Sequence, residues 1–558
     1  MAKTTGAKLF AEIMQGYGIT HVFYVPQVVS KALVAMEDMP IRRVVAHSEK
    51  AAGYMADGYA RARGGPGVCM AQPIGASNLA SGLRDAYMAR SPVIAISGGP
   101  EPASRYRHSY QEVEDFDQFN SVTKSNVNVD TPSRVPDLMR QAFRTATSGT
   151  PGPVHLRFQG RLSDVPLGET DAEAVIEQQF ARVPPFRPEP EAERVREAAA
   201  ILAAAKKPII IAGGGVVWSQ AQREVVELAE KLQIPVVTTL NGKGIILDTH
   251  RLSVGVAGTY SRECANRAVS EADLVFFIGS PAGGMVTSNW KLIAKGTAVM
   301  QLDIEATELG RNYPNKVALL GDAKVTLTRL IEAAQVKEGT TKAWLGRVQE
   351  LVGEWRAQAQ AKLNSAAVPM HPARICKEIT DALPANGVVV SDTGHAGMWT
   401  SQFIDLNQRG QRYIRCAGSL GWGLPGAIGV KCALPDQPVL CFTGDGGMYY
   451  HMTELDTALR YGINLVVLVN NNRALSQEFP SLKNNYGGAM RGHSDELWRF
   501  GEFNFAKVAE AMGCAGFRVE QPGELRAVLQ KAFTLNKPAV VEVMSDVSLM
   551  APSAWVPK

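Results

Sequence analysis

The 558-residue sequence has no stretch of about 18 uninterrupted apolar residues, the length that a membrane-spanning helix needs. Its first residues also lack the basic region, apolar core and small-residue cleavage site of a secretory leader. We therefore expect neither a membrane-bound nor an exported protein.

Cysteine is sparse and shows no pattern. The seven cysteines are odd in number, scattered and without CxxC spacing, which argues against a disulfide framework or a zinc site. Long Lys/Arg runs are also lacking, and 58 basic against 54 acidic side chains leave a formal net charge of +4. This balance gives no support for binding nucleic acid or a membrane surface. We expect buried thiols in a cytoplasmic protein.

The chain has the composition of a globular protein, 46% hydrophobic and 20% charged, and it is long enough for about three or four domains. Amphipathic helical patterns alternate with short apolar strands, which predicts doubly wound α/β domains with parallel sheets. We expect three in tandem, at residues 1–165, 191–345 and 373–558, with linkers at 166–190 and 346–372. The expected strands lie at 21–25, 42–47, 67–72, 92–98, 153–158, 206–215, 234–244, 272–280, 298–305, 387–394, 413–416, 438–442, 465–469 and 538–546.

The segment Cys441–Asn472, CFTGDGGMYYHMTELDTALRYGINLVVLVNNN, is typical of one βαβ unit. A strand breaks at GDGG, a helix of about 11 residues follows, and a second strand ends at three asparagines. A parallel crossover then places Asp445 and Asn472 at neighbouring carboxyl ends of one sheet, where ligands bind. Their oxygens suit Mg²⁺, and the glycine N–H groups suit a phosphate. A tight strand-to-helix turn is the alternative interpretation.

These residues resemble the thiamine diphosphate motif of the superfamily that includes acetolactate synthase, pyruvate oxidase and pyruvate decarboxylase. The resemblance covers essentially the whole chain and implies a pyrimidine-binding, a middle and a diphosphate-binding domain. It also implies thiamine diphosphate and Mg²⁺ as cofactors, with the metal held by Asp445, Asn472 and the carbonyl of Ala474. The two asparagines before Asn472 are register alternatives.

Glu49 lies in HSEKAAGYMADGYAR, which is similar to the family's RHEQGAAHMAEGYAR. The resemblance implies that Glu49 relays a proton to the aminopyrimidine of the cofactor. A glutamate that caps a helix or forms a salt bridge is the alternative. Gln111, in a segment similar to the family's FQE, and Gln27, near the family's VFGVPG, are further candidates to contact substrate.

A glycine-rich stretch, CAGSLGWGLPGAIG, is similar to the family's GTMGFGLPAAIG. The resemblance makes Leu420 the wedge that bends the cofactor and the Gly418 carbonyl an acceptor for its amino group. The implied cofactor-binding set is Gly75, Asn78, Thr393, Gly394, His395, Ala396, Gly418, Ser419, Leu420, Gly444, Asp445, Gly446, Gly447 and Asn472.

The middle domain lacks the flavin-flanking motifs of acetolactate synthases. The resemblance leaves open FAD, or a nucleotide such as ADP or CoA, at this domain. Lys243, Arg262 and Lys291 are candidate contacts for such a ligand, or ordinary surface charges.

The sequence therefore predicts an acetolactate synthase-like decarboxylase or carboligase that makes or breaks a C–C bond next to a carbonyl, acting on a small 2-oxo acid. One alternative is a 2-hydroxyacyl-CoA lyase or related acyl-CoA enzyme, and an aldehyde is a further candidate substrate. A non-catalytic thiamine diphosphate-binding protein is the second alternative. The resemblance implies a homodimer or homotetramer with active sites between subunits.

Overall fold

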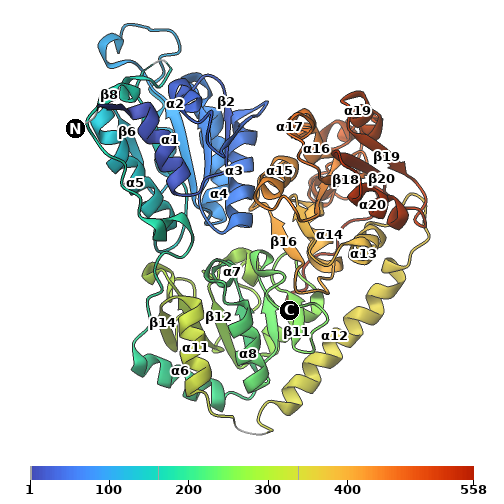
Figure 1. Ribbon diagram of the computed structural model, residues 1–558. Helices are drawn as coiled ribbons and strands as arrows, with labels where there is room; N and C mark the ends of the chain where they lie inside the picture. Colours follow the sequence, from blue (N-terminus) through green and yellow to red (C-terminus); the bar gives the residue numbers. More distant parts are fainter. Residues whose placement is uncertain (1–2, 161, 337–338) are drawn as a thin grey trace.

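The computed structural model describes residues 3–160, 162–336 and 339–558, and folds them around three six-stranded parallel sheets (Figure 1). The first sheet has the order β3-β2-β4-β5-β7-β6. Its strands are β2 (His21–Val25), β3 (Arg42–Val45), β4 (Gly67–Ala71), β5 (Val93–Gly98), β6 (Asn126–Val129) and β7 (Val154–Phe158). Its helices are α1 (Gly6–Gly16), α2 (Ser30–Ala35), α3 (Glu49–Arg63), α4 (Ala76–Met88) and α5 (Val135–Thr147). A short antiparallel pair, β1 (Thr4–Thr5) with β8 (Glu169–Thr170), lies outside this sheet.

The second sheet has the order β11-β10-β9-β12-β13-β14. Its strands are β9 (Pro208–Ala212), β10 (Val236–Thr238), β11 (Ser253–Val256), β12 (Leu274–Ile278), β13 (Ala298–Asp303) and β14 (Val317–Leu320). Its helices are α6 (Ala192–Ala204), α7 (Gly214–Ser219), α8 (Gln222–Leu232), α9 (Glu263–Glu271), α10 (Gly284–Thr287) and α11 (Ala323–Ala333). The long helix α12 (Lys342–Leu363) runs from this unit towards the third (Figure 1).

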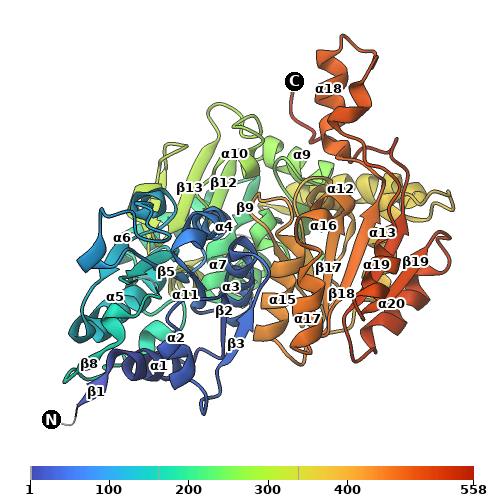
Figure 2. The ribbon, with the colours of Figure 1, turned by 90° about the horizontal axis from the view of Figure 1, so that it is seen from above.

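The third sheet has the order β16-β15-β17-β18-β20-β19. Its strands are β15 (Val388–Ser391), β16 (Arg412–Arg415), β17 (Val439–Gly444), β18 (Val466–Asn471), β19 (Ala515–Val519) and β20 (Ala539–Met544). Its helices are α13 (Pro372–Ala382), α14 (His395–Phe403), α15 (Gly423–Ala433), α16 (Asp445–His451), α17 (Glu454–Arg460), α18 (Phe479–Asn485), α19 (Phe505–Ala511) and α20 (Leu525–Phe533). Figure 2 shows α18 standing away from the body of the molecule. The three parallel sheets confirm the expected tandem α/β architecture.

One hydrophobic core joins the first and third units. It includes Phe23 and Cys69 of the first sheet, Trp422 beside α15, and Val467 of the third sheet. Helices α3 and α15 meet within it at glycines, since a Cβ on Gly58 would lie 2.1 Å from the carbonyl oxygen of Gly426. The two units are therefore held together by close backbone contact as well as by apolar burial.

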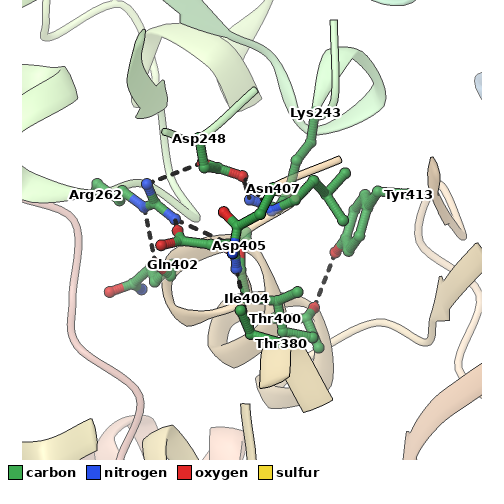
Figure 3. A network of polar contacts seen from close by, with 12 residues as sticks. Lys243, Asp248, Arg262, Thr380, Thr400, Gln402, Ile404, Asp405, Asn407 and Tyr413 are labelled. Carbon is green, nitrogen blue, oxygen red and sulfur yellow. Dashed lines mark hydrogen bonds and ion pairs between the residues drawn. The ribbon is translucent and has the colours of Figure 1, made fainter. Parts of the chain in front are cut away.

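The middle unit is tied to the third by buried charges. Arg262 pairs with Asp248 at 2.9 Å and with Asp405 at 2.5 Å, and Lys243 pairs with Asp248 at 3.2 Å (Figure 3). Arg356 of α12 also pairs with Asp405, at 3.1 Å. Lys243 and Arg262 are thus neither surface charges nor free to contact a nucleotide, because both side chains are buried and satisfied by carboxylates. Lys291 is exposed.

Candidate active site

Residues expected to bind the cofactor follow neighbouring strands of the third sheet. Thr393–Ala396 follows β15, Gly418–Leu420 follows β16, Gly444–Gly447 spans the end of β17, and Asn472 follows β18. Strands β16, β15, β17 and β18 are adjacent and parallel, so their carboxyl ends lie along one edge. The fold thus gathers four separate segments at the place where open α/β sheets bind ligands.

The first sheet gathers its candidates in the same way. Gln27, Glu49 and Gly75 follow β2, β3 and β4, and Gln111 lies in the connection that follows β5. These four strands are adjacent in the order β3-β2-β4-β5 and parallel. The N-terminal candidates therefore share one edge, although no hydrogen bond among the described residues links Gln27 or Gln111 to Glu49.

Asp445 begins α16 and is only 3% exposed. Its Oδ1 accepts from the Gly446 N–H at 2.7 Å, and its Oδ2 accepts from the Ala474 N–H at 3.0 Å. Burial raises the pKa of this carboxyl to about 6, against these hydrogen bonds. The contact with Ala474 confirms that the GDGG turn and the loop after β18 meet. The expected single helix is instead two short ones, α16 and α17.

The three consecutive asparagines differ in their surroundings. Asn470 and Asn471 belong to β18 and are buried, and Asn471 donates from Nδ2 to Oε1 of Glu542 at 2.7 Å. Asn472 lies beyond the strand, and its Nδ2 donates to the Ser476 hydroxyl at 3.0 Å. Of the three, Asn472 is the one that belongs to the loop at the carboxyl edge.

His395 also contacts Ser476. Its Nδ1 lies 2.8 Å from the Ser476 hydroxyl oxygen, and burial lowers the pKa of the imidazole to about 4. His395 is therefore neutral at pH 7. Gly394 has a φ of 65°, and a Cβ there would lie 2.7 Å from Oε1 of Gln477, so this turn requires glycine.

Two buried carboxylates that the sequence analysis missed organise the glycine-rich loop. Asp392 accepts from the N–H groups of Thr393, Gly421 and Gly423 at 2.8, 3.1 and 3.0 Å, and from the Thr443 hydroxyl at 3.1 Å. Burial raises its pKa to about 6. Asp392 thereby fixes three of the four carboxyl-end segments of the third sheet relative to one another.

Asp85 of α4 reaches the same loop from the first unit. It accepts from three consecutive N–H groups, those of Ala417, Gly418 and Ser419, at 2.6, 3.0 and 2.9 Å. Arg61 pairs with Asp85 at 3.2 Å. The sequence gives little signal for either aspartate, because their partners are distant backbone groups that any residue type provides.

Glu49 is the first residue of α3, after the N-cap Ser48, whose hydroxyl accepts from the Ala51 N–H at 3.3 Å. Its Oε2 accepts from Nδ2 of Asn78 at 3.2 Å. A Cβ on Gly75 would lie 2.3 Å from its Oε1, so any larger residue there would displace this carboxyl. The structure therefore brings Glu49, Gly75 and Asn78 together.

A cavity of about 390 Å³ opens at the middle sheet. Gly214 and Gly215 after β9, Ser280 after β12 and Asp303 at the end of β13 line it. Burial raises the pKa of Asp303 to about 6. In the Gly213–Gly215 turn, a Cβ on Gly215 would lie 2.6 Å from Cα of Gly279. Gly215 therefore also allows the two turns to pack closely.

No group of three or more His, Cys, Asp or Glu side chains that could hold a metal occurs among the residues that the structure describes. A metal at Asp445 would thus rely on amide and backbone oxygens in addition to the single carboxylate. In the same described part of the chain, no helix is both long and apolar enough to cross a membrane.

Comparison with known families gives matches along most of the chain. Residues 4–120 match the thiamine pyrophosphate enzyme N-terminal TPP binding domain, 195–330 the central domain and 392–543 the C-terminal TPP binding domain. A probable acetolactate synthase large subunit of Methanocaldococcus jannaschii is 31% identical, over 97% of this chain and 92% of that protein. The acetolactate synthase isozyme 1 large subunit of Escherichia coli is 30% identical, over 97% and 94%. The acetolactate synthase large subunit of Lactococcus lactis is 29% identical, over 97% and 92%.

Proposed function

Because the chain belongs to the thiamine pyrophosphate enzyme family and is a thiamine diphosphate-dependent enzyme of C–C bond chemistry, we propose that it decarboxylates a small 2-oxo acid and joins the remaining fragment to a second carbonyl compound. The observation that carries the proposal is the full-length similarity to acetolactate synthase large subunits. When bound, thiamine diphosphate supplies a nucleophilic carbon and an electron sink for this chemistry.

The residues at the third sheet fit the diphosphate and its metal. Asp445 is a buried carboxylate whose pKa burial raises to about 6, and its hydrogen bonds come from backbone N–H groups. A hard dication at this oxygen would offset the desolvation of the charged form. We propose Asp445, Asn472 and the Ala474 carbonyl as ligands of Mg²⁺. The position of Asn472 beyond β18 favours it over Asn470 and Asn471.

The remaining cofactor contacts are proposed from their places on the two edges. Glu49 would hold and move a proton at its carboxyl, with Gly75 leaving it room and Asn78 orienting it. Leu420 would shape the bound cofactor from a loop that Asp85 and Asp392 hold in place. The other proposed contacts are Gln27, Gln111, Thr393, Gly394, His395, Ala396, Gly418, Ser419, Gly444, Gly446 and Gly447.

We propose that the middle cavity holds a nucleotide-containing group, FAD or one such as ADP or CoA. Its support is the position of the cavity at the carboxyl ends of β9, β12 and β13, together with Asp303, which suits ribose hydroxyl groups. The visible spectrum of the purified protein distinguishes a flavin from a colourless nucleotide.

We further propose a homodimer or homotetramer, in the cytoplasm, with active sites between subunits. Apolar side chains are exposed beside both edges, Ile74 next to Gly75 and Tyr450 in α16, at 52% and 57%. Apolar side chains at the edge of a site suit contact with a partner subunit. All seven cysteines are free and buried, as a reducing compartment allows.

The test is an assay of the enzyme with thiamine diphosphate and Mg²⁺ against 2-oxo acids, 2-hydroxyacyl-CoA esters and aldehydes. We expect CO₂ release and a carboligation product from pyruvate or a close homologue, and light scattering of the same sample should give a dimer or larger. Cleavage of acyl-CoA esters with no turnover of any 2-oxo acid would overturn the proposal in favour of a lyase.

A further inference from the structure

A second large hollow lies where the three units meet. It has a volume of about 940 Å³ and is lined from residues 61–64, 217–230, 243–250 and 409–415, and we call it the three-domain groove. It shares a wall with the middle cavity at Trp218, Asn241 and Arg415. The residues proposed to contact thiamine diphosphate or its metal are not among those that line it, so the groove is separate from the proposed thiamine diphosphate site.

The groove carries an excess of positive charge. Seven lysine and arginine side chains but two glutamates are among its lining residues within the described chain. Some of these cations are already neutralised, Arg61 by Asp57 and Lys243 by Asp248. Arg63, Arg409, Arg412 and Arg415 form no ion pair with an acidic side chain of the described residues. Cations that line one hollow without acidic partners attract an anion.

Arg415 is the strongest indication of a ligand. It ends β16, is 5% exposed, and its Nε is buried without a hydrogen-bond partner. None of its guanidinium nitrogens donates to, or pairs with, another described residue. A buried N–H without a partner is costly, because the Nε of Arg415 has lost its water and gained no hydrogen bond in exchange. Arg415 lines the groove, so an anion there would complete its hydrogen bonding.

Arg412, on the same strand, has a related environment. It donates to the carbonyl oxygens of Ala62 at 3.0 Å and Arg61 at 3.3 Å. Burial lowers the pKa of its guanidinium, since no acidic side chain of the described residues offsets the loss of water. The two carbonyls occupy only some of the five N–H donors of Arg412 and leave the others for a ligand.

We propose that the three-domain groove binds an oligophosphate anion of up to nucleotide size, with Arg415 as the buried anchor and Arg412 and Arg409 at the rim. The planar guanidinium matches two phosphate oxygens at once, which makes arginine a preferred phosphate ligand. A groove of about 940 Å³ is large for a 2-oxo acid and within the range of nucleotide-sized pockets. Three separated cations suit several phosphate charges better than one carboxylate.

The test is calorimetric titration of the enzyme saturated with thiamine diphosphate, at fixed free Mg²⁺, with inorganic triphosphate and in parallel with ATP. We expect one saturable site for triphosphate per chain, and its affinity should fall with salt. If triphosphate and ATP bind with equal affinity, the phosphate chain is the ligand. If ATP binds tenfold more tightly, the nucleoside also contacts the groove. Both outcomes support the proposal. Absence of saturable binding for both probes overturns it.

Variants locate the site. Arg415→Gln should weaken binding by about tenfold or more, because a charge-assisted bidentate contact is lost. The double variant Arg409→Gln with Arg412→Gln should also weaken binding. It replaces Arg415→Gln as the test if that variant fails to fold. Arg329→Gln, whose arginine pairs with Glu189 at the surface and does not line the groove, should bind as the wild type does.

Because Arg415 also lines the middle cavity, a further pair separates the two hollows. Met285 lines only the middle cavity, and Arg412 lines only the groove. Met285→Glu should leave triphosphate binding within about twofold, whereas Arg412→Gln should weaken it severalfold. The reverse result would place the anion in the middle cavity and overturn the proposal.

Discussion

At both proposed cofactor surfaces, single buried carboxylates hold the backbone of the surrounding loops in place. Asp85, Asp392 and Asp445 are buried and accept mainly from backbone N–H groups of loops. A carboxylate has about four acceptor sites, so one side chain can hold two or three loop segments at once. Replacing such a group leaves several buried donors unpaired, which costs far more than one surface contact.

The variant Glu49→Gln should bind thiamine diphosphate within about threefold of the wild-type affinity. Its turnover should fall by about 10²–10⁴-fold, because an amide of the same shape cannot move the proton. Calorimetry and steady-state kinetics measure the two quantities. Glu37→Gln, at an exposed glutamate paired with Arg43, is the matched control and should be silent. Full turnover of Glu49→Gln would contradict the proton relay.

At Asp392, lowering the pH through about 6 should weaken cofactor binding by about tenfold, because the protonated carboxyl gives up an acceptor that holds the loop. The folded-state pKa lies above the ordinary 3.8, so protonation of this group adds stability as pH falls from about 6 to about 4. The loss of cofactor affinity should therefore occur without unfolding caused by protonation of Asp392.

The measurement is cofactor affinity and melting temperature between pH 5 and 8. Asp445 has a pKa of about 6 as well, so the comparison uses Asp392→Asn, which keeps Asp445. The variant should bind weakly at every pH and lose part of the pH dependence. A pH profile identical to that of the wild type would show that Asp392 does not control the loop.

At the scale of elements, the contact of α3 with α15 depends on glycine. A Cβ on Gly58 would lie 2.1 Å from the Gly426 carbonyl oxygen, and a Cβ on Gly429 would lie 1.9 Å from that of Met55. Gly58→Ala should lower the free energy of unfolding by about 1–3 kcal/mol or more, because the helices must move apart. Urea denaturation measures the change.

The matched control is Gly353→Ala in α12, where no atom lies within 4 Å of the added Cβ. This variant should raise the free energy of unfolding by about 0.5–1 kcal/mol, because alanine has the higher helix propensity. Equal effects of the two substitutions would mean that the α3–α15 contact is not tightly packed.

Elements also show how far the sequence predicts the fold. The interior strands of the three six-stranded sheets lie where apolar runs predict them. Four strands of these sheets that the sequence does not predict, β6, β11, β14 and β19, are all at sheet edges, and the short pair β1 and β8 is not predicted either. An edge strand is buried less completely by its neighbours and carries both polar and apolar residues, such as NVNV in β6. Its pairing is decided by the neighbouring strand rather than by its own hydrophobic pattern.

For the whole molecule, the buried charges of Figure 3 couple the middle unit to the third. Burial opposes ionisation of Asp405, but Arg262 and Arg356 outweigh it and hold its pKa at about 2. Asp405→Asn should cost about 3–5 kcal/mol, because Arg262 stays buried with one partner fewer. Calorimetry should show the middle unit melting before the rest.

The control for Asp405 is Asp381→Asn. Asp381 is partly exposed and pairs with Lys377 and Arg526, so its loss should cost about 1 kcal/mol or less. If both variants lower stability equally and keep a single transition, the buried network does not couple the units.

Residues whose chemistry is local can be read from the sequence alone: the GDGG turn with Asp445, the start of α3 at Glu49 and the glycine-rich loop before α15. Their spacing along the chain carries the pattern, so a motif predicts them. Only the tertiary structure showed the roles of Asp85 and Asp392, the lack of a partner for Arg415 among the described residues, and the burial of Lys243 and Arg262. The partners of the two aspartates are backbone groups of segments far apart in the chain, and the burial of each cation depends on how whole units pack.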